Sequence, residues 1–171
     1  MAQIEVLKGV RYRPEMLIKR MSRSKNMENI QCRHVSTLYS LCWVFQFRIG
    51  LQASKRTRRY AGYYAGFDES VMSPGKIAML PTAELQQVED CCVIEDKLSE
   101  EDALARAWEY NKRGIFRKFR NLYAPPELEE YVADRYYKPM YVFEFHNLEL
   151  DERKYMTLDS LTGDLEEIVL R

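Results

Sequence analysis

The chain reads YSLCWVFQF over residues 39–47 and YKPMYVFEF over residues 137–145. The two runs align without a gap at a spacing of 98 residues, and five consecutive positions agree in chemical type. Both runs are rich in aromatic and β-branched side chains, a composition typical of β-strands. Because side chains alternate across a strand, Trp43, Phe45 and Phe47 are expected to line one face of the first strand.

The segments that follow the two runs also correspond in kind. Each run is followed by a polar turn, a second strand, a turn that begins with Asp and ends with Gly, and a third strand. Asp favours the start of such turns because its side chain bonds to the backbone, and Gly tolerates positive φ. We expect the later strands at residues 60–67 and 76–80 in the first copy, and at 154–158 and 164–170 in the second. The sequence thus predicts an internal duplication of an antiparallel, three-stranded meander.

Helices are expected in the intervals between these strands. The sequence Ser-Glu-Glu-Asp at residues 99–102 is similar to a capping box, and the helix that it opens should end near Gly114. Pro125 and Pro126 predict the start of another helix, over residues 127–136. Residues 14–25 are a third candidate, with an apolar stripe at helical spacing.

The predicted fold class is therefore α+β: antiparallel meander sheets with packing helices, internally duplicated. The predicted division is a basic first unit at residues 1–81, a crossover at residues 82–98, and an acidic second unit at residues 99–171.

The second half resembles the PepSY domain family. The resemblance lies in the helix that begins EDALARA at residue 101, the strand MYVFEF at residues 140–145, and the closing segment YMTLDSLTGDL at residues 155–165. It extends more loosely over residues 37–81. It implies a helix packed on an antiparallel sheet, and a binding or inhibitory role toward a peptide or protease. The chain departs from the family in lacking a signal peptide and in inserting residues 116–136 between helix and strand.

Composition and the N-terminus favour a cytoplasmic protein without a membrane segment. No run approaches the roughly 18 consecutive apolar residues of a membrane helix. The N-terminal sequence MAQIEV has neither the basic region nor the apolar region of a signal peptide. The expected location is therefore the cytoplasm.

Four cysteines are expected to be free thiols in that compartment. A zinc site built from Cys32, His34, Cys91 and Cys92 is the alternative, but structural zinc sites usually present two spaced pairs of ligands, which this pattern does not provide. We predict no metal and no cofactor.

Charge is distributed unevenly, although the chain is neutral overall. Residues 1–60 hold 13 basic and three acidic side chains, and the remainder holds 13 basic and 23 acidic ones. The densest basic cluster falls in a predicted hairpin and is followed by aromatic residues. The candidate partner-binding residues are Lys55, Arg56, Arg58, Arg59, Tyr60 and Tyr63.

No catalytic residues are proposed from the sequence. It contains no phosphate-binding glycine loop, no HExxH motif and no Gly-x-Ser-x-Gly elbow. The leading hypothesis is a non-enzymatic regulatory module that binds a protein or peptide, with an acidic partner or a second copy in a homodimer both compatible with the charge. The alternative is a nucleic-acid-binding protein that uses residues 55–64. An enzyme with an unrecognised site is the third reading.

Overall fold

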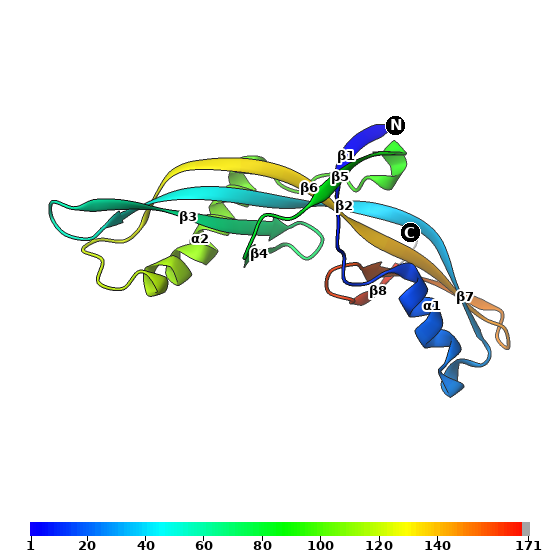
Figure 1. Ribbon diagram of the computed structural model, residues 1–171. Helices are drawn as coiled ribbons and strands as arrows, with labels where there is room; N and C mark the ends of the chain where they lie inside the picture. Colours follow the sequence, from blue (N-terminus) through cyan, green and yellow to red (C-terminus); the bar gives the residue numbers. More distant parts are fainter. Residues whose placement is uncertain (169–171) are drawn as a thin grey trace. The chain divides into compact units, whose positions relative to one another are not determined.

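Strands dominate the computed structural model, which describes residues 1–168 (Figure 1). Strands make up 50% of the chain and helix 20%. The elements are β1 (Ala2–Leu7), α1 (Pro14–Ser22), η1 (Lys25–Met27), β2 (Ile30–Gln52), β3 (Arg58–Asp68), β4 (Ser73–Lys76), β5 (Ala83–Val88), η2 (Asp90–Cys92), α2 (Glu100–Lys118), β6 (Glu127–Asn147), β7 (Glu152–Asp159) and β8 (Leu165–Ile168). The sheet order is β4-β3-β2-β6-β1-β5, with β7 paired to β6 and β8 to β7.

The predicted fold class is wrong. The strands form one large mixed sheet with few helices, and not helix-packed α+β meanders. The sheet is mixed because β1 meets β6 in parallel at Val6 and Tyr137, whereas the other strand pairs with a defined register are antiparallel. Strand content is higher than expected because residues 83–88 and 127–136 are strands, and because β2 begins at Ile30, before the aromatic run.

The strand over residues 127–136 replaces a predicted helix. Its acidic side chains bond to neighbouring strands: Glu127 and Glu129 pair with Arg58, and Asp134 accepts a hydrogen bond from Gln46. The aromatic and β-branched residues of this segment also favour an extended chain. These contacts between strands outweigh the local helix signal of the two prolines.

Two other strand boundaries also differ from the sequence interpretation. The strand expected at residues 76–80 lies earlier, at Ser73–Lys76, where Phe67 pairs with Pro74. The last strand is observed over Leu165–Ile168, and the end of its expected range, residues 169–170, lies outside the described residues.

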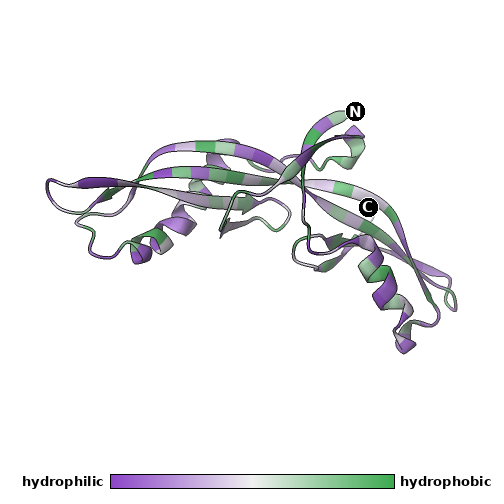
Figure 2. Ribbon diagram, in the orientation of Figure 1, coloured by the Kyte–Doolittle hydropathy of each residue, from purple (hydrophilic) through white to green (hydrophobic). Residues whose placement is uncertain are grey.

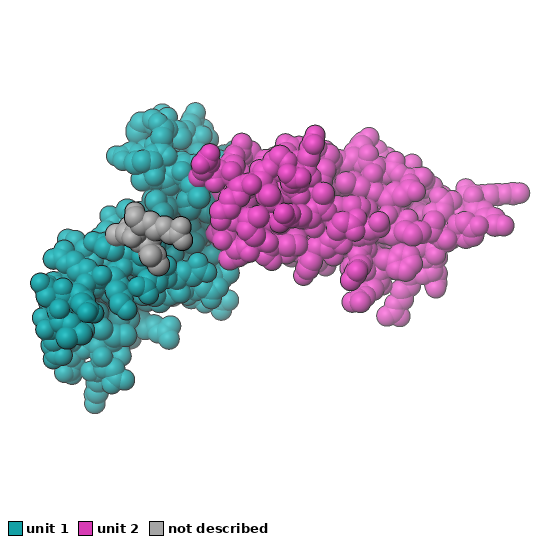
Figure 3. All heavy atoms as spheres, turned by 180° about the vertical axis from the view of Figure 1, so that it is seen from behind, with its two compact units in different colours: residues 1–40, 82–94, 137–171 teal, residues 41–81, 95–136 magenta. Residues whose placement is uncertain are grey.

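The chain divides into two compact units that do not follow its linear order (Figure 3). Unit 1 contains residues 1–40, 82–94 and 137–171, and unit 2 contains residues 41–81 and 95–136. Strands β2 and β6 each contribute residues to both units. The predicted units, residues 1–81 and 99–171, are instead successive stretches of the sequence. That division stays a prediction.

In unit 1, helix α1 packs on the aromatic segment of β6. Leu17 forms a buried cluster with Tyr141, Phe143 and Leu158. Leu158 reaches the cluster because β7 pairs with β6 in antiparallel register, with Tyr141 opposite Leu158. Figure 2 shows hydrophobic and hydrophilic residues following one another along α1, as expected of a helix with one buried side.

Unit 1 also contains a buried ion pair. The Nζ atom of Lys138 donates to Oδ2 of Asp159, and the two residues are 0% and 3% exposed. The other carboxylate oxygen accepts from the backbone amides of Leu161 and Thr162 at 2.8 and 3.1 Å. Burial raises the pKa of Asp159, but Lys138 and these amides outweigh this effect and hold the pKa below its ordinary value.

We expect Asp159→Asn to reduce the free energy of unfolding by about 3–5 kcal/mol at neutral pH, because it leaves a buried ammonium without its carboxylate. The amide oxygen still accepts the turn hydrogen bonds, so the loss reports the ion pair. Since the folded-state pKa is lowered, this stability is present above the unfolded pKa and is lost as the pH falls through the folded one. Urea denaturation followed by circular dichroism measures both effects. The exposed Asp164→Asn is the control, and an equal effect of the two substitutions would contradict the assignment.

In unit 2, helix α2 covers the aromatic row of β2. Trp43, Phe45 and Phe47 stack along the strand with ring centroids 6.1 and 6.0 Å apart, and Trp108 of α2 contacts Phe47 edge-on at 5.6 Å. The helix begins where Oγ of Ser99 accepts the amide of Asp102, as the sequence predicts. The buried face of α2 consists of Ala103, Ala107, Asn111 and Ile115.

No helix within residues 1–168 is both long and apolar enough to span a bilayer.

Candidate functional site

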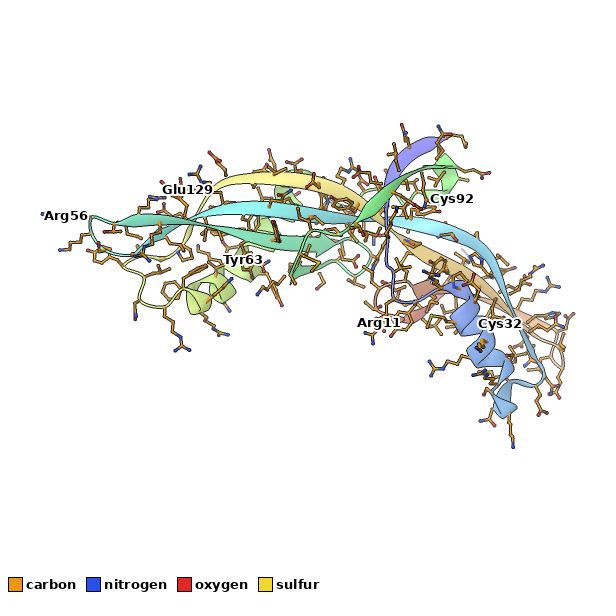
Figure 4. The ribbon with its side chains drawn as sticks, in the orientation of Figure 1. Arg11, Cys32, Arg56, Tyr63, Cys92 and Glu129 are labelled. Atoms are coloured by element: carbon orange, nitrogen blue, oxygen red, sulfur yellow. The ribbon has the colours of Figure 1, made fainter. Side chains whose placement is uncertain are left out.

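The basic hairpin that joins β2 to β3 is exposed. Lys55, Arg56, Arg58 and Arg59 all lie at the surface, and the turn is closed by backbone amides that donate to Oγ of Ser54. Figure 4 shows Arg56 at the tip of the hairpin. The four cations are therefore close to one another and open to solvent.

Of these four, Arg58 has carboxylate partners. It pairs with Glu127 at 2.9 Å and also with Glu129, and both acids belong to β6. Gly50 leaves room for this contact, because a Cβ atom there would lie 2.7 Å from Oε1 of Glu129. Arg58 is consequently the least available of the hairpin cations for a partner.

The two aromatic candidates differ in accessibility. Tyr60 is 52% exposed, and the guanidinium of Arg48 lies 4.5 Å from its ring centroid. Tyr63 is only 7% exposed and donates its hydroxyl hydrogen to Oδ1 of Asn111 on α2 at 3.1 Å. Burial raises the pKa of Tyr63, with a smaller contribution from Tyr110. Tyr63 therefore belongs to the core of unit 2 and presents no ring to a partner.

The last turns of α2 contribute further cations to the site, which the sequence did not predict. There Lys112, Arg113 and Arg117 lie along an open groove of about 420 Å³, together with Glu109. The apolar part of its lining is Phe116, Pro125 and Pro126. Phe116 is 48% exposed, so its ring adds apolar surface to the groove beside the two prolines. The helix was expected to end near Gly114 but continues to Lys118, so neither its last turn nor the position of that turn in space was predicted.

The hairpin and this part of α2 lie at the same end of unit 2. The loop after α2 is joined to the base of the hairpin, because the amide of Tyr123 donates to the carbonyl of Gln52 at 2.7 Å. The ion pair between Arg58 and Glu127 makes a second connection. We call this region the basic end of unit 2 and define its cations as Lys55, Arg56, Arg58, Arg59, Lys112, Arg113, Arg117, Lys118 and Arg120.

Most of the cations at the basic end have no acidic partner in the part of the chain that the structure describes. Within residues 1–168, the carboxylates at this end contact Arg48, Arg58 and Lys112. No carboxylate of the described chain lies within 4.0 Å of the seven others, which are Lys55, Arg56, Arg59, Arg113, Arg117, Lys118 and Arg120. Like charges this close together repel, and an anionic partner would relieve that repulsion.

The four residues considered as zinc ligands, which are Cys32, His34, Cys91 and Cys92, do not come together in one site. Cys32 packs beside the α1 cluster, and His34 contacts the rings of Tyr141 and Phe143. Among the described residues, Cys91 and Cys92 instead meet Glu89. All four cysteines are free.

In comparisons with protein-family models, with curated proteins and with solved structures, nothing matches this chain.

The position of Tyr63 predicts a structural role. We expect Tyr63→Phe to reduce the free energy of unfolding by about 1 kcal/mol, because the buried Oδ1 of Asn111 loses its donor. Denaturation followed by the fluorescence of Trp43 and Trp108, both in unit 2, measures this change. Tyr60→Phe removes an exposed hydroxyl and serves as the control. Equal stability of the two variants would show that the buried hydrogen bond contributes nothing.

Proposed function

We propose that the chain is a non-enzymatic binding module that docks an acidic segment of a protein or peptide on the basic end of unit 2. The observation that supports this is the cluster of seven cations for which the described chain supplies no carboxylate within 4.0 Å, two of which, Arg113 and Arg117, line the groove beside Phe116, Pro125 and Pro126. Carboxylates of the partner would pair with these cations, and an apolar side chain would cover Phe116, Pro125 and Pro126.

The balance of charge and apolar surface defines the partner. An exposed ion pair contributes only about 0–1 kcal/mol and is screened by salt. Charge alone would therefore give weak, strongly salt-dependent binding. Covering apolar surface adds about 25 cal/mol for each Å² removed from water. The partner that fits best is an acidic segment with one large apolar residue among its carboxylates.

Single-stranded nucleic acid, the alternative function, fits the surface less well. Such binders stack bases on aromatic rings beside the cations. Here Tyr63 is buried, and the ring of Tyr60 already has the guanidinium groups of Arg48 and Arg58 at 4.5 and 6.0 Å from its centroid. The two tyrosines expected to stack on bases are therefore buried or already contacted by guanidinium groups, and the exposed ring that the groove itself offers is that of Phe116.

Three further assignments form part of this proposal. We place the binding in the cytoplasm, which the four free cysteines support. The PepSY resemblance also implies peptide binding, and it stays a prediction. A homodimer stays a prediction as well, and light scattering of the purified protein would test it.

The test uses a fluorescent 12-residue peptide of Glu and Asp with one central Leu. We expect it to bind, and Arg113→Gln combined with Arg117→Gln to weaken binding about three- to thirtyfold, because two exposed ion pairs are lost. Arg56→Gln with Arg59→Gln should act similarly, whereas Arg58→Gln should matter less, because Arg58 is already paired. Fluorescence anisotropy at two salt concentrations measures these effects.

The matched control is Arg23→Gln combined with Lys154→Gln, which removes the same charge from exposed positions in unit 1. Phe116→Ser separates the apolar contribution from charge. Equal weakening by the control pair would mean that net charge, and not the basic end, is responsible. Tighter binding of a mixed single-stranded oligonucleotide, lost in the same arginine variants, would favour the nucleic-acid function instead.

A further inference from the structure

Two thiols and a carboxylate converge on one turn of unit 1. Glu89, Cys91 and Cys92 follow β5, and Asp90–Cys92 form the short helix η2. Figure 4 shows Cys92 beside this turn. The Sγ atoms of the two cysteines and a carboxylate oxygen of Glu89 all lie within 4.8 Å of one another.

Backbone contacts hold the turn on both sides. Before it, Val88 pairs with Ala2 in the β1–β5 ladder. Within it, the amide of Cys92 donates to the carbonyl of Glu89 at 2.9 Å. After it, the amide of Ile94 donates to the carbonyl of Tyr39 at 2.9 Å. The three side chains therefore project from a fixed backbone, which reduces the entropy lost on binding a ligand.

Neighbouring charges leave the three donor groups available. The N-terminal amino group of Met1 pairs with Asp90 at 2.9 Å, so this acid is engaged elsewhere. Glu89 has no ion-pair partner within the described chain, and the one side-chain hydrogen bond that its carboxylate accepts there comes from Sγ of Cys91 at 3.6 Å. Glu89 and Cys91 are exposed and Cys92 is partly exposed, so an ion has access from solvent.

We propose that Glu89, Cys91 and Cys92 form a binding site for a thiophilic divalent metal ion of the Zn²⁺ type. Zinc bonds to thiolate sulfur at about 2.3 Å and to carboxylate oxygen at about 2.0–2.2 Å, so tetrahedral ligand atoms lie about 3.4–3.8 Å apart. The observed separations need to contract by at most about 1–1.4 Å, which side-chain rotation supplies.

Binding of the ion releases the protons of the two thiols. Two S–H bonds break, two Zn–S bonds form, and the two thiol protons pass to solvent. The ionised carboxylate of Glu89 supplies the third bond, and water occupies the fourth position. The resulting site has two thiolates and one carboxylate, a ligand set that favours Zn²⁺ or Cd²⁺ over Mg²⁺ or Ca²⁺.

The test is a titration of the full chain with Zn²⁺ or Cd²⁺ in the presence of a non-thiol reductant. We expect one ion per chain, with cadmium–thiolate charge-transfer absorption as the direct signature of sulfur ligation. Cys91→Ser and Cys92→Ser should each lower the affinity at least about tenfold, since even the loss of a group that only orients a ligand has effects of this size. Glu89→Gln should weaken binding and leave the cadmium–thiolate absorption in place.

Cys32→Ser is the matched control, because Cys32 lies in the same unit but packs beside the α1 cluster. Circular dichroism of each variant separates loss of ligation from loss of folding. The proposal is overturned if the Cys91→Ser/Cys92→Ser double variant, folded as judged by its spectrum, binds the ion as well as the unchanged chain. It is equally overturned if Mg²⁺ at the same concentration displaces Cd²⁺.

Discussion

The packing of α2 on the aromatic row of β2 determines where the proposed binding surface of unit 2 lies. Phe45 and Phe47 are nearly completely buried, and Trp108 of α2 packs edge-on against the ring of Phe47. Asn111 is fixed as well, because it bonds to Tyr63, to the carbonyl of Ala107 and to the carbonyl of Gly75. With its buried face held in this way, α2 directs Arg113 and Arg117 outward at the end where the hairpin turns.

The arrangement of charge follows from this packing. The acids of β6 neutralise Arg48 and Arg58 on the strands, while no carboxylate of the described chain lies within 4.0 Å of the cations at the hairpin tip or of Arg113 and Arg117 on α2. Clustered cations reduce the stability of a folded chain, and this cost is the physical reason for proposing that the surface binds an anionic partner. The same argument does not apply to Lys138 in unit 1, whose charge is paired inside the core.

Sequence patterns predicted those structural elements whose conformation depends on residues that are close together in the chain. The aromatic strands, the Ser99 cap of α2 and the exposed hairpin all depend on short stretches of sequence. The strand at residues 127–136 was missed because its partners, Arg58 among them, are distant in sequence. Tyr63 was expected at the surface because its partner, Asn111, is also distant in sequence. The groove on α2 and the contact of Glu89 with the two thiols were not predicted either.

The most direct test of the central claim is a map of amide chemical-shift changes as the acidic peptide is titrated into the isotope-labelled chain. The account predicts that two segments shift together, residues 54–60 of the hairpin and residues 109–126 of α2 and its loop, while the amides of α1 stay in place. Shifts confined to one of these segments, or spread over the exposed cations of unit 1, would contradict a single binding surface at the basic end of unit 2.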